Sequence, residues 1–306
     1  MKKLLFTISA YGYLETAFLA TGEFDRGQLH QKPFPDGEIY RRVVDDAWGR
    51  DVVLLGGTPT DADWLELYDF GSAISRAGAR SLSIVMPYFG YSTMERAVKP
   101  GEVVTAKTRA RLISSIPPCE GGTRTFLFDL HTDGIEFYFS DSHTTHHVYG
   151  ARIVTEAIEN IAAGKDFVLG ATDAGRAKWV ESLARTMRCE PAFVYKRRDP
   201  SSGDLTVTGV NADVKGKCVV IYDDMIRTGG SLLQAAEAYK SAGATEVHAM
   251  ASHLVLPGDA LKRLTTSGLV ASVNGTDSHP KSEAVRAAGG HVVSVAGLMA
   301  SEIGRS

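Results

Sequence analysis

Short apolar runs rich in β-branched residues recur along the chain and alternate with stretches of helical periodicity. Runs of this kind predict buried strands, and the longer periodic stretches predict helices. In the amino-terminal half we expect strands over Lys3–Ser9, Ile39–Val44, Asp51–Gly56, Ser81–Met86 and Thr125–Leu130. Helices are expected over Ala62–Ala77 and Thr105–Ile116.

The alternation begins again after a hinge that we place near Ser142–Tyr149. Alternating strands and helices indicate an α/β fold, in which mainly parallel sheets are covered by helices on both faces. Ligands of such sheets bind beyond the carboxyl ends of the strands. In this half we expect helices over Gly150–Ala162 and Ala174–Thr186, and a third after the turn that follows Tyr222, running towards Ser241-Ala242-Gly243. Strands are expected over Phe167–Gly170, Ala192–Lys196, Leu205–Val210, Cys218–Tyr222, Val247–Leu254 and His291–Val295.

Length and composition indicate a globular protein of two domains. The chain has 306 residues, which exceeds the usual size of one domain, and 44% of its residues are hydrophobic. A net charge of −3 gives no electrostatic case for a nucleic acid or a membrane as a partner. Cys119, Cys189 and Cys218 are far apart and form no CxxC pair, which fits a reduced, cytoplasmic setting. The apolar start of the chain is interpreted as a first strand rather than a signal peptide.

A glycine-rich turn between the Cys218–Tyr222 strand and the next helix carries the most informative chemistry. Free backbone N–H groups and the positive end of a helix dipole make such a turn an anion site. Carboxylates repel a phosphate but suit sugar hydroxyls or a divalent cation. The turn therefore predicts a site for a phosphorylated sugar, the alternative being a purely structural turn. Its residues are Asp223, Asp224, Arg227, Thr228, Gly229, Gly230 and Ser231.

Two segments of the amino-terminal half could bind a nucleotide. Phe34 could stack on a base, and Asp36 and Glu38 in the same turn could bind its amino or hydroxyl groups, although an ordinary polar turn would look the same. Arg96 follows the Ser81–Met86 strand and places a cation where a polyphosphate would bind. The helix after it carries Lys107, Arg109 and Arg111, for which a solvated basic face is an equal alternative.

Further candidates lie at strand ends. His131 ends one apolar strand and could ligate a metal or contact a phosphate, the alternative being a hydrogen-bonded core histidine. Asp173 has the matching position in the second half. Lys196 and Arg198 enter a Ser/Gly hairpin and could balance charge in phosphoryl transfer, or form a plain basic turn. A zinc site at His143, His146 and His147 is not expected, because these histidines lack cysteine partners.

Taken together, these segments resemble the ribose-phosphate pyrophosphokinases, also called phosphoribosyl pyrophosphate synthetases, from about Phe34 to Leu298. The glycine-rich turn alone is shared with phosphoribosyltransferases. The most specific segments are Phe34–Glu38, Pro87–Arg96 with Thr105-Ala106-Lys107, Asp129-Leu130-His131, Lys196-Arg197-Arg198 and Asp223–Ser231.

The resemblance implies a fold and a reaction. The fold is two similar phosphoribosyltransferase-like domains, each a mainly parallel sheet flanked by helices, over residues 1–146 with 290–306 and over residues 147–289. The reaction transfers the pyrophosphoryl group of ATP to ribose 5-phosphate. The resemblance also implies Mg²⁺ as cofactor and a homo-oligomer with sites near subunit interfaces.

The resemblance also implies roles for individual residues, each at its place in this sequence. Phe34, Asp36 and Glu38 would hold adenine, and Arg96 would meet the nucleotide phosphates. His131 and Asp173 would lie at magnesium positions, with His131 also counted among the catalytic residues. Lys196 and Arg198 would stabilise the transition state. Asp223 and Asp224 would bind the ribose hydroxyls, and Thr228 to Ser231 would bind the 5-phosphate. Arg227 is counted among the ribose-phosphate-binding residues.

Two departures from the family pattern keep alternatives open. Thr93-Met94 replaces an Arg-Gln pair that contacts ATP, and this variant resembles the divergent plant-type class, which is phosphate-independent. Arg227 stands where an acid or a neutral polar group is common. The alternatives are transfer to another ribose-phosphate acceptor such as ADP-ribose, a non-catalytic nucleotide-binding regulatory relative, and a phosphoribosyltransferase.

Overall fold

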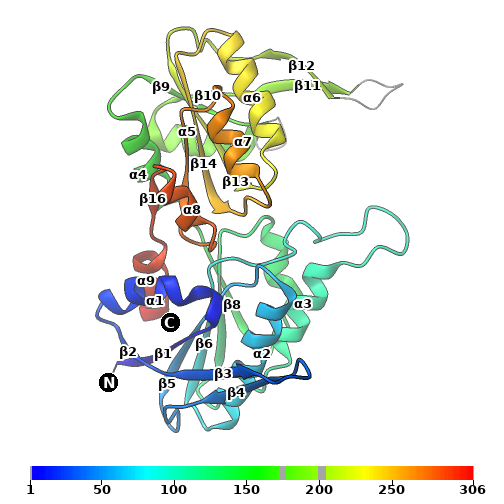
Figure 1. Ribbon diagram of the computed structural model, residues 1–306, viewed down its shortest axis with the longest axis vertical. Coiled ribbons are helices and arrows are strands. Elements are labelled where there is room, and N and C mark those ends of the chain that lie inside the picture. Colours follow the sequence, from blue (N-terminus) through cyan, green and yellow to red (C-terminus); the bar gives the residue numbers. More distant parts are fainter. Residues whose placement is uncertain (1, 173–176, 199–204, 306) are drawn as a thin grey trace. The chain divides into compact units, whose positions relative to one another are not determined.

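The computed structural model describes residues 2–172, 177–198 and 205–305 (Figure 1). The side chains of residue 177 and of residues 196–198 and 205–208 lie outside the description. The chain divides into two compact units, one made of Met1–Tyr149 with Ser294–Ser306 and the other of Gly150–Val293. No helix in the described part of the chain is long and apolar enough to cross a bilayer.

The first unit is built on a parallel six-stranded sheet with the order β2-β1-β5-β6-β7-β8. Two further strands, β3 (Leu29–Pro33) and β4 (Ile39–Val43), pair with each other as an antiparallel hairpin. The sheet strands are β1 (Lys3–Thr7), β2 (Phe24–Arg26), β5 (Asp51–Leu55), β6 (Ser81–Met86), β7 (Thr123–Phe128) and β8 (Thr144–Val148). The helices are η1 (Ser9–Tyr11), α1 (Gly12–Ala20), α2 (Asp61–Arg76), α3 (Thr105–Ser114), η2 (Asp133–Tyr138) and α9 (Ala296–Arg305).

Local sequence signals explain the helices of this unit. Thr60 and Asp63 form a reciprocal capping box that starts α2, and Trp64 in its first turn is fully buried. The carboxyl-terminal α9 returns to the first unit and packs against α1, as Figure 1 shows in red and blue. Lys3 Nζ of β1 donates to the carbonyl of Ile303 at 2.7 Å, which ties the last helix to the first strand.

The second unit repeats the design with a parallel six-stranded sheet in the order β10-β9-β13-β14-β15-β16. A separate antiparallel hairpin pairs β11 (Val194–Arg198) with β12 (Leu205–Val210). The sheet strands are β9 (Phe167–Gly170), β10 (Glu190–Ala192), β13 (Cys218–Ile226), β14 (Glu246–Leu254), β15 (Ser272–Thr276) and β16 (Val292–Val293). The helices are α4 (Ala151–Ala162), α5 (Ala177–Met187), α6 (Gly230–Ser241), α7 (Ala260–Thr266) and α8 (Ser282–Ala287).

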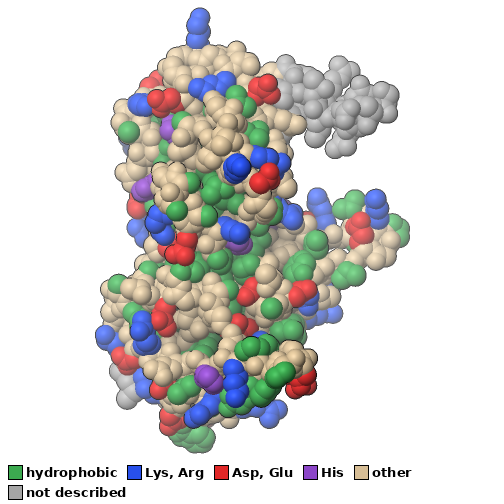
Figure 2. Space-filling model, viewed as in Figure 1, with side chains coloured by type: hydrophobic (Ala, Val, Ile, Leu, Met, Phe, Trp, Pro, Cys, Tyr) green, Lys and Arg blue, Asp and Glu red, His purple; other side chains and the backbone are tan. Residues whose placement is uncertain are grey.

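These two sheets confirm the expected fold class of mainly parallel sheets flanked by helices. Two hydrophobic clusters flank the second sheet, one beneath α6, α7 and α8 and the other beneath α4 and α5. Central strands are buried on both faces, which explains why they appear in the sequence as continuous apolar runs. Figure 2 shows basic and acidic side chains interspersed on the visible face, in keeping with the small net charge.

Several expected boundaries were wrong for identifiable reasons. The first strand ends at Thr7, because η1 begins at Ser9. The strand expected to reach Leu130 ends at Phe128, because Asp129 takes a positive φ of 43°. The strand expected to end at Tyr222 continues to Ile226, because its ladder with β14 extends as far as the pair of Ile226 with Leu254.

Buried histidines make the stability of the second unit depend on pH. His279 lies just after β15, is 6% exposed, and accepts the Lys281 N–H through Nδ1 at 3.2 Å. Burial, reinforced by the neighbouring His253 and Lys281, lowers the pKa of His279 to about 3. The unfolded chain, with a histidine pKa of about 6.5, takes up this proton first. The contribution of His279 is therefore fully present above about pH 6.5 and is lost as the pH falls towards about 3.

We expect the free energy of unfolding to fall by about 2 kcal/mol between about pH 7 and pH 5 through His279 alone. Denaturant titrations at both pH values measure this fall for the original chain and for His279→Asn, which keeps an acceptor but cannot be protonated. The fall should be about 2 kcal/mol smaller in the variant. If the free energy of unfolding fell equally in both chains, the pKa of His279 would not be lowered in the folded protein.

Candidate functional site

The loop between β13 and α6 forms the first part of the candidate site. β13 is a central strand that lies between β9 and β14, so the loop after its carboxyl end lies near the middle of the row of strand ends. Gly229 caps α6 in the left-handed conformation with φ 79°. Within the described residues no side chain caps this helix, which leaves its first N–H groups available to a ligand. The geometry is that of an anion site at a helix amino end.

The two glycines of the loop serve different purposes. A Cβ atom on Gly229 would lie 3.1 Å from Leu264 and would be strained by the positive φ. A Cβ atom on Gly230 would find its nearest neighbour, Thr228 Oγ1, at 4.0 Å. The fold therefore requires glycine at position 229. It leaves open space at position 230, where a ligand could approach the backbone.

The carboxylate of Asp223 is held in place from two sides. Its Oδ1 accepts the Asp224 N–H at 2.9 Å, and its Oδ2 accepts the hydroxyl of Thr172 at 3.2 Å. Thr172 is buried and lies just beyond β9, the neighbouring strand. Asp223 and Asp224 are half-buried, so both are fixed by the fold and open to a ligand.

Aromatic packing supports the strand behind these carboxylates. The ring of Tyr222 stacks on Trp179 of α5 with centroids 4.7 Å apart and planes within 9°. The Tyr222 hydroxyl lies 2.8 Å from Ser252 Oγ. A small hollow lined by Trp179, Tyr222 and both carboxylates lies here.

Arg263 supports the loop between β13 and α6, and no pattern in the sequence indicated this role. Its guanidinium donates to the carbonyl of Thr228 at 2.8 Å and pairs with Asp259 one turn earlier on the chain. Thr228, Gly230 and Ser231 are exposed, as is Arg227. Arg263 thus holds the Thr228 carbonyl, while these four residues remain exposed to solvent.

The expected base-binding turn is the tip of the β3–β4 hairpin. The Phe34 N–H donates to the Glu38 carbonyl at 2.7 Å, and the Glu38 N–H donates to Asp36 Oδ1 at 3.1 Å, which closes the turn. Phe34 is 41% exposed. Lys32 Nζ lies 5.4 Å from its ring centroid and 5.7 Å from that of Tyr40. The turn therefore presents an aromatic ring, two carboxylates and a cation to solvent.

The segment after β6 places Arg96 in solvent. Its side chain is 79% exposed, and Nε lies 3.4 Å from the Glu95 carboxylate. Arg109 of α3 instead donates to Asp61 at 2.6 Å and lies over the Tyr91 ring, so its contacts are structural. Whether Lys107, Arg109 or Arg111 of this helix contacts a polyphosphate stays a prediction.

The segment carrying His131 leaves β7 through a sharp bend. Asp129 has φ 43° and is buried, and the next N–H, of Leu130, donates to His147 Nε2 at 2.9 Å. Burial lowers the pKa of His147, which keeps Nε2 available as an acceptor. His147 Nδ1 lies 3.3 Å from the Asp133 carboxylate. His131 is half-buried at this bend, where an ion could reach it.

Of the predicted site residues, the structure describes Lys196 and Arg198 only in their backbone and does not describe Asp173. Asp173 lies outside the described residues. The backbone of β11 pairs Lys196 with Val207 and Arg198 with Leu205, while both side chains lie outside the description. Their predicted roles therefore stay predictions.

The structure brings only some of the predicted site residues together. The residues predicted to bind the ribose phosphate, from Asp223 to Ser231, lie together at one loop of the second unit. Phe34, Arg96 and His131 lie on separate segments of the first unit.

Comparison with known proteins gives consistent matches over most of the chain. Residues 3–116 match the model of the N-terminal domain of ribose phosphate pyrophosphokinase, and residues 148–264 match that of the phosphoribosyl transferase domain. The ribose-phosphate pyrophosphokinase of Synechococcus elongatus is 33% identical over 285 residues, which cover 92% of this chain and 83% of the relative. That of Rhizobium meliloti is 33% identical over 283 residues, which cover 92% and 89%.

A solved structure agrees with these matches. The crystal structure of phosphoribosylpyrophosphate synthetase from Mycobacterium smegmatis matches with a TM-score of 0.86 and 28% sequence identity. The match covers 99% of this chain and 98% of that one, so both units are included.

Proposed function

This chain belongs to the ribose-phosphate pyrophosphokinase family, and from that premise we propose that it makes 5-phosphoribosyl 1-pyrophosphate and AMP from ATP and ribose 5-phosphate. The anomeric hydroxyl oxygen attacks the β-phosphorus of ATP and forms a new P–O bond. The bond between the β-phosphorus and the α,β-bridging oxygen breaks, AMP leaves with the electron pair, and the hydroxyl proton is released. The resemblance seen in the sequence is thus confirmed at the level of the family.

The observation that carries this proposal is the loop between β13 and α6. Its exposed hydroxyls and uncapped helix amino end suit the 5-phosphate. Asp223, held by Thr172 and by the Asp224 N–H, suits the ribose hydroxyls beside it. The direct test is whether AMP forms only when ATP and ribose 5-phosphate are both supplied.

We assign the remaining steps to residues on other segments. Arg96 binds nucleotide phosphates, and the exposed ring of Phe34 stacks on adenine while Asp36 and Glu38 accept hydrogen bonds from it. Lys196 and Arg198 balance the charge that develops on the transferred group. Because Phe34 and Tyr40 are exposed on one hairpin, we propose that the hairpin completes a site of another subunit in a homo-oligomer.

Magnesium is the cofactor that we propose for this reaction. Phosphate oxygens and carboxylates are hard ligands of the kind Mg²⁺ prefers, and the Asp223–Asp224 pair is half-buried and open to solvent. His131 and Asp173 would hold the ion, and the half-buried His131 lies where an ion can reach it. Bound Mg²⁺ neutralises charge on the phosphates.

We also propose that the chain belongs to the phosphate-independent class of the family. Thr93 and Met94 replace the Arg-Gln pair, and Met94 is 44% exposed, in the segment that leads to Arg96. An enzyme of this class turns over without added inorganic phosphate.

We further propose a cytoplasmic location for this protein, because its three cysteines are free thiols.

A substitution at Gly230 should weaken ligand binding without destabilising the fold. We expect Gly230→Ala to fold with a free energy of unfolding within about 1 kcal/mol of the original, because a Cβ atom meets open space there. The same methyl group would meet the bound phosphate, so the Kd for ribose 5-phosphate should rise at least about tenfold. Calorimetric titration with ribose 5-phosphate measures the change.

Gly229→Ala is the matched control for this prediction. It should lose stability because of its positive φ and its contact with Leu264. If Gly230→Ala bound ribose 5-phosphate with unchanged affinity, the phosphate would not lie against this loop.

A further inference from the structure

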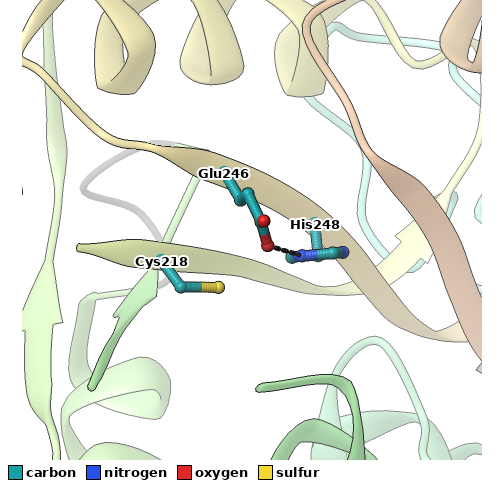
Figure 3. Close-up of side chains that lie close together, drawn as sticks. All are labelled: Cys218, Glu246 and His248. Atoms are coloured by element: carbon teal, nitrogen blue, oxygen red, sulfur yellow. Dashed lines mark hydrogen bonds and ion pairs between the residues drawn. The ribbon is translucent and has the colours of Figure 1, made fainter. Parts of the chain in front are cut away.

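Three side chains of types that can bind metals come together at the amino ends of β13 and β14 (Figure 3), at the opposite end of β13 from the loop that leads to α6. Cys218 is the first residue of β13, and Glu246 and His248 begin β14. The parallel register pairs Cys218 with Glu246 and Val220 with His248, which places the three side chains on one face. The sulfur, a carboxylate oxygen and an imidazole nitrogen all lie within 4.8 Å of one another.

The donor set matches a borderline-soft divalent ion rather than magnesium. Thiolate, imidazole and carboxylate are the ligands that Zn²⁺ takes in proteins, whereas Mg²⁺ prefers oxygen alone. Tetrahedral zinc with bonds of about 2.0–2.1 Å holds nitrogen and oxygen donors about 3.3 Å apart. His248 Nε2 already lies 3.3 Å from Glu246 Oε2. The sulfur needs a donor separation of about 3.6 Å, which a small side-chain movement supplies.

Ser272 prepares the imidazole for coordination. Its Oγ lies 2.8 Å from His248 Nδ1 and also accepts the Asn274 amide at 2.8 Å. A hydroxyl can donate to Nδ1 or accept from it, so it supports either neutral tautomer of the ring. With metal bound, Nδ1–H donates to Ser272 and leaves the Nε2 lone pair to the ion, an outer-shell arrangement common to metal-bound histidines.

Lys165 would compete with a metal ion for the Glu246 carboxylate. Its ammonium lies 2.7 Å from Glu246 Oε2 and follows the end of α4. This contact and the one with His248 lower the pKa of Glu246, while burial raises the pKa of the Cys218 thiol. A metal ion must displace the lysine and the thiol proton, so binding weakens as the pH falls.

We propose that Cys218, Glu246 and His248 bind a divalent transition-metal ion of the zinc type, with a water molecule as fourth ligand. The ion exchanges with the thiol proton: the S–H bond breaks, a sulfur–metal bond forms, and one proton enters solvent. The ion joins the start of β13 to the start of β14, away from the carboxyl-end loop that binds ribose 5-phosphate. Among the described residues this is the group whose ligand atoms converge in this way, whereas His143, His146 and His147 point to separate partners.

The test is a titration of the full chain with Co²⁺ in excess Mg²⁺, which fills sites made of hard oxygen ligands. We expect one equivalent to bind and to produce the near-ultraviolet charge-transfer band of a thiolate–cobalt bond, which Zn²⁺ then removes. Cys218→Ser should lack the band. Cys189→Ser, the matched control at a half-buried cysteine in the same unit, should keep it.

Further variants keep the proposal testable if Cys218→Ser folds poorly. His248→Gln should bind Zn²⁺ at least about tenfold more weakly, and Lys165→Gln should bind it more tightly because the competing cation is gone. Zinc binding should also release a proton into solvent, which an unbuffered titration with a pH indicator detects. A missing charge-transfer band in the original chain, or equal zinc affinity in His248→Gln, would overturn the proposal.

Discussion

Lys196→Ala is expected to lower kcat by about a thousandfold, while the KM for ribose 5-phosphate stays within about twofold. Pyrophosphoryl transfer creates charge on the transferred group in the transition state, and a cation placed there stabilises that state more than the bound substrates. Lys196 belongs to β11, the hairpin strand whose partner is β12, and the loop that we propose to bind ribose 5-phosphate follows a different strand, β13. Removing the cation should therefore leave ribose 5-phosphate binding intact.

Steady-state kinetics with ATP and ribose 5-phosphate varied separately measure this split. Lys215→Ala is the matched control, because Lys215 is an exposed lysine of the same unit that lies before β13. It should keep the original kcat. An unchanged kcat in Lys196→Ala would remove this residue from the mechanism.

Asp223→Asn is expected to lower kcat/KM for ribose 5-phosphate by about a hundredfold. Hydrogen bonds from sugar hydroxyls to a charged carboxylate each contribute about 1.5–3 kcal/mol, and an amide offers one neutral acceptor instead. The amide can keep the support of this side chain, because its oxygen can accept the Asp224 N–H while its NH₂ group donates to the Thr172 hydroxyl, which can also act as an acceptor.

Two further variants locate the cause of that loss. Thr172→Val keeps the buried volume but removes one support, so its loss should be smaller, about tenfold. Asp213→Asn changes an exposed aspartate before β13 and should leave the kinetics unchanged. If Asp223→Asn kept the original kcat/KM for ribose 5-phosphate, the sugar hydroxyls would not contact this carboxylate.

Continuous apolar runs made the parallel sheets predictable. The strands over Ser81–Met86, Phe167–Gly170 and Leu205–Val210 have the expected bounds, because their sequences favour a strand without help from the rest of the fold. The helix α1 (Gly12–Ala20) was missed. Its first residue is a glycine, it has no side-chain cap, and its stability comes from packing against α9.

The loop of the candidate site was predictable because its chemistry is contiguous in the sequence, from Asp223 to Ser231. Thr172 and Arg263 support this loop from positions 51 and 35 residues away from the groups they contact. Contacts of that span depend on strand order and on how α7 packs, which no local pattern encodes. The same holds for Cys218 and His248, which the parallel register of β13 and β14 brings together.

The most direct test of the central claim is phosphorus NMR of the purified chain with Mg²⁺, ATP and ribose 5-phosphate. We predict that the resonance of AMP and new signals of a pyrophosphate linked to the anomeric carbon appear together. Both products should form at the same rate, and no inorganic phosphate need be added. Replacing ribose 5-phosphate by ADP-ribose should give far slower turnover. Nucleotide binding without AMP formation, or release of free pyrophosphate in place of AMP, would contradict the assignment of pyrophosphoryl transfer to this chain.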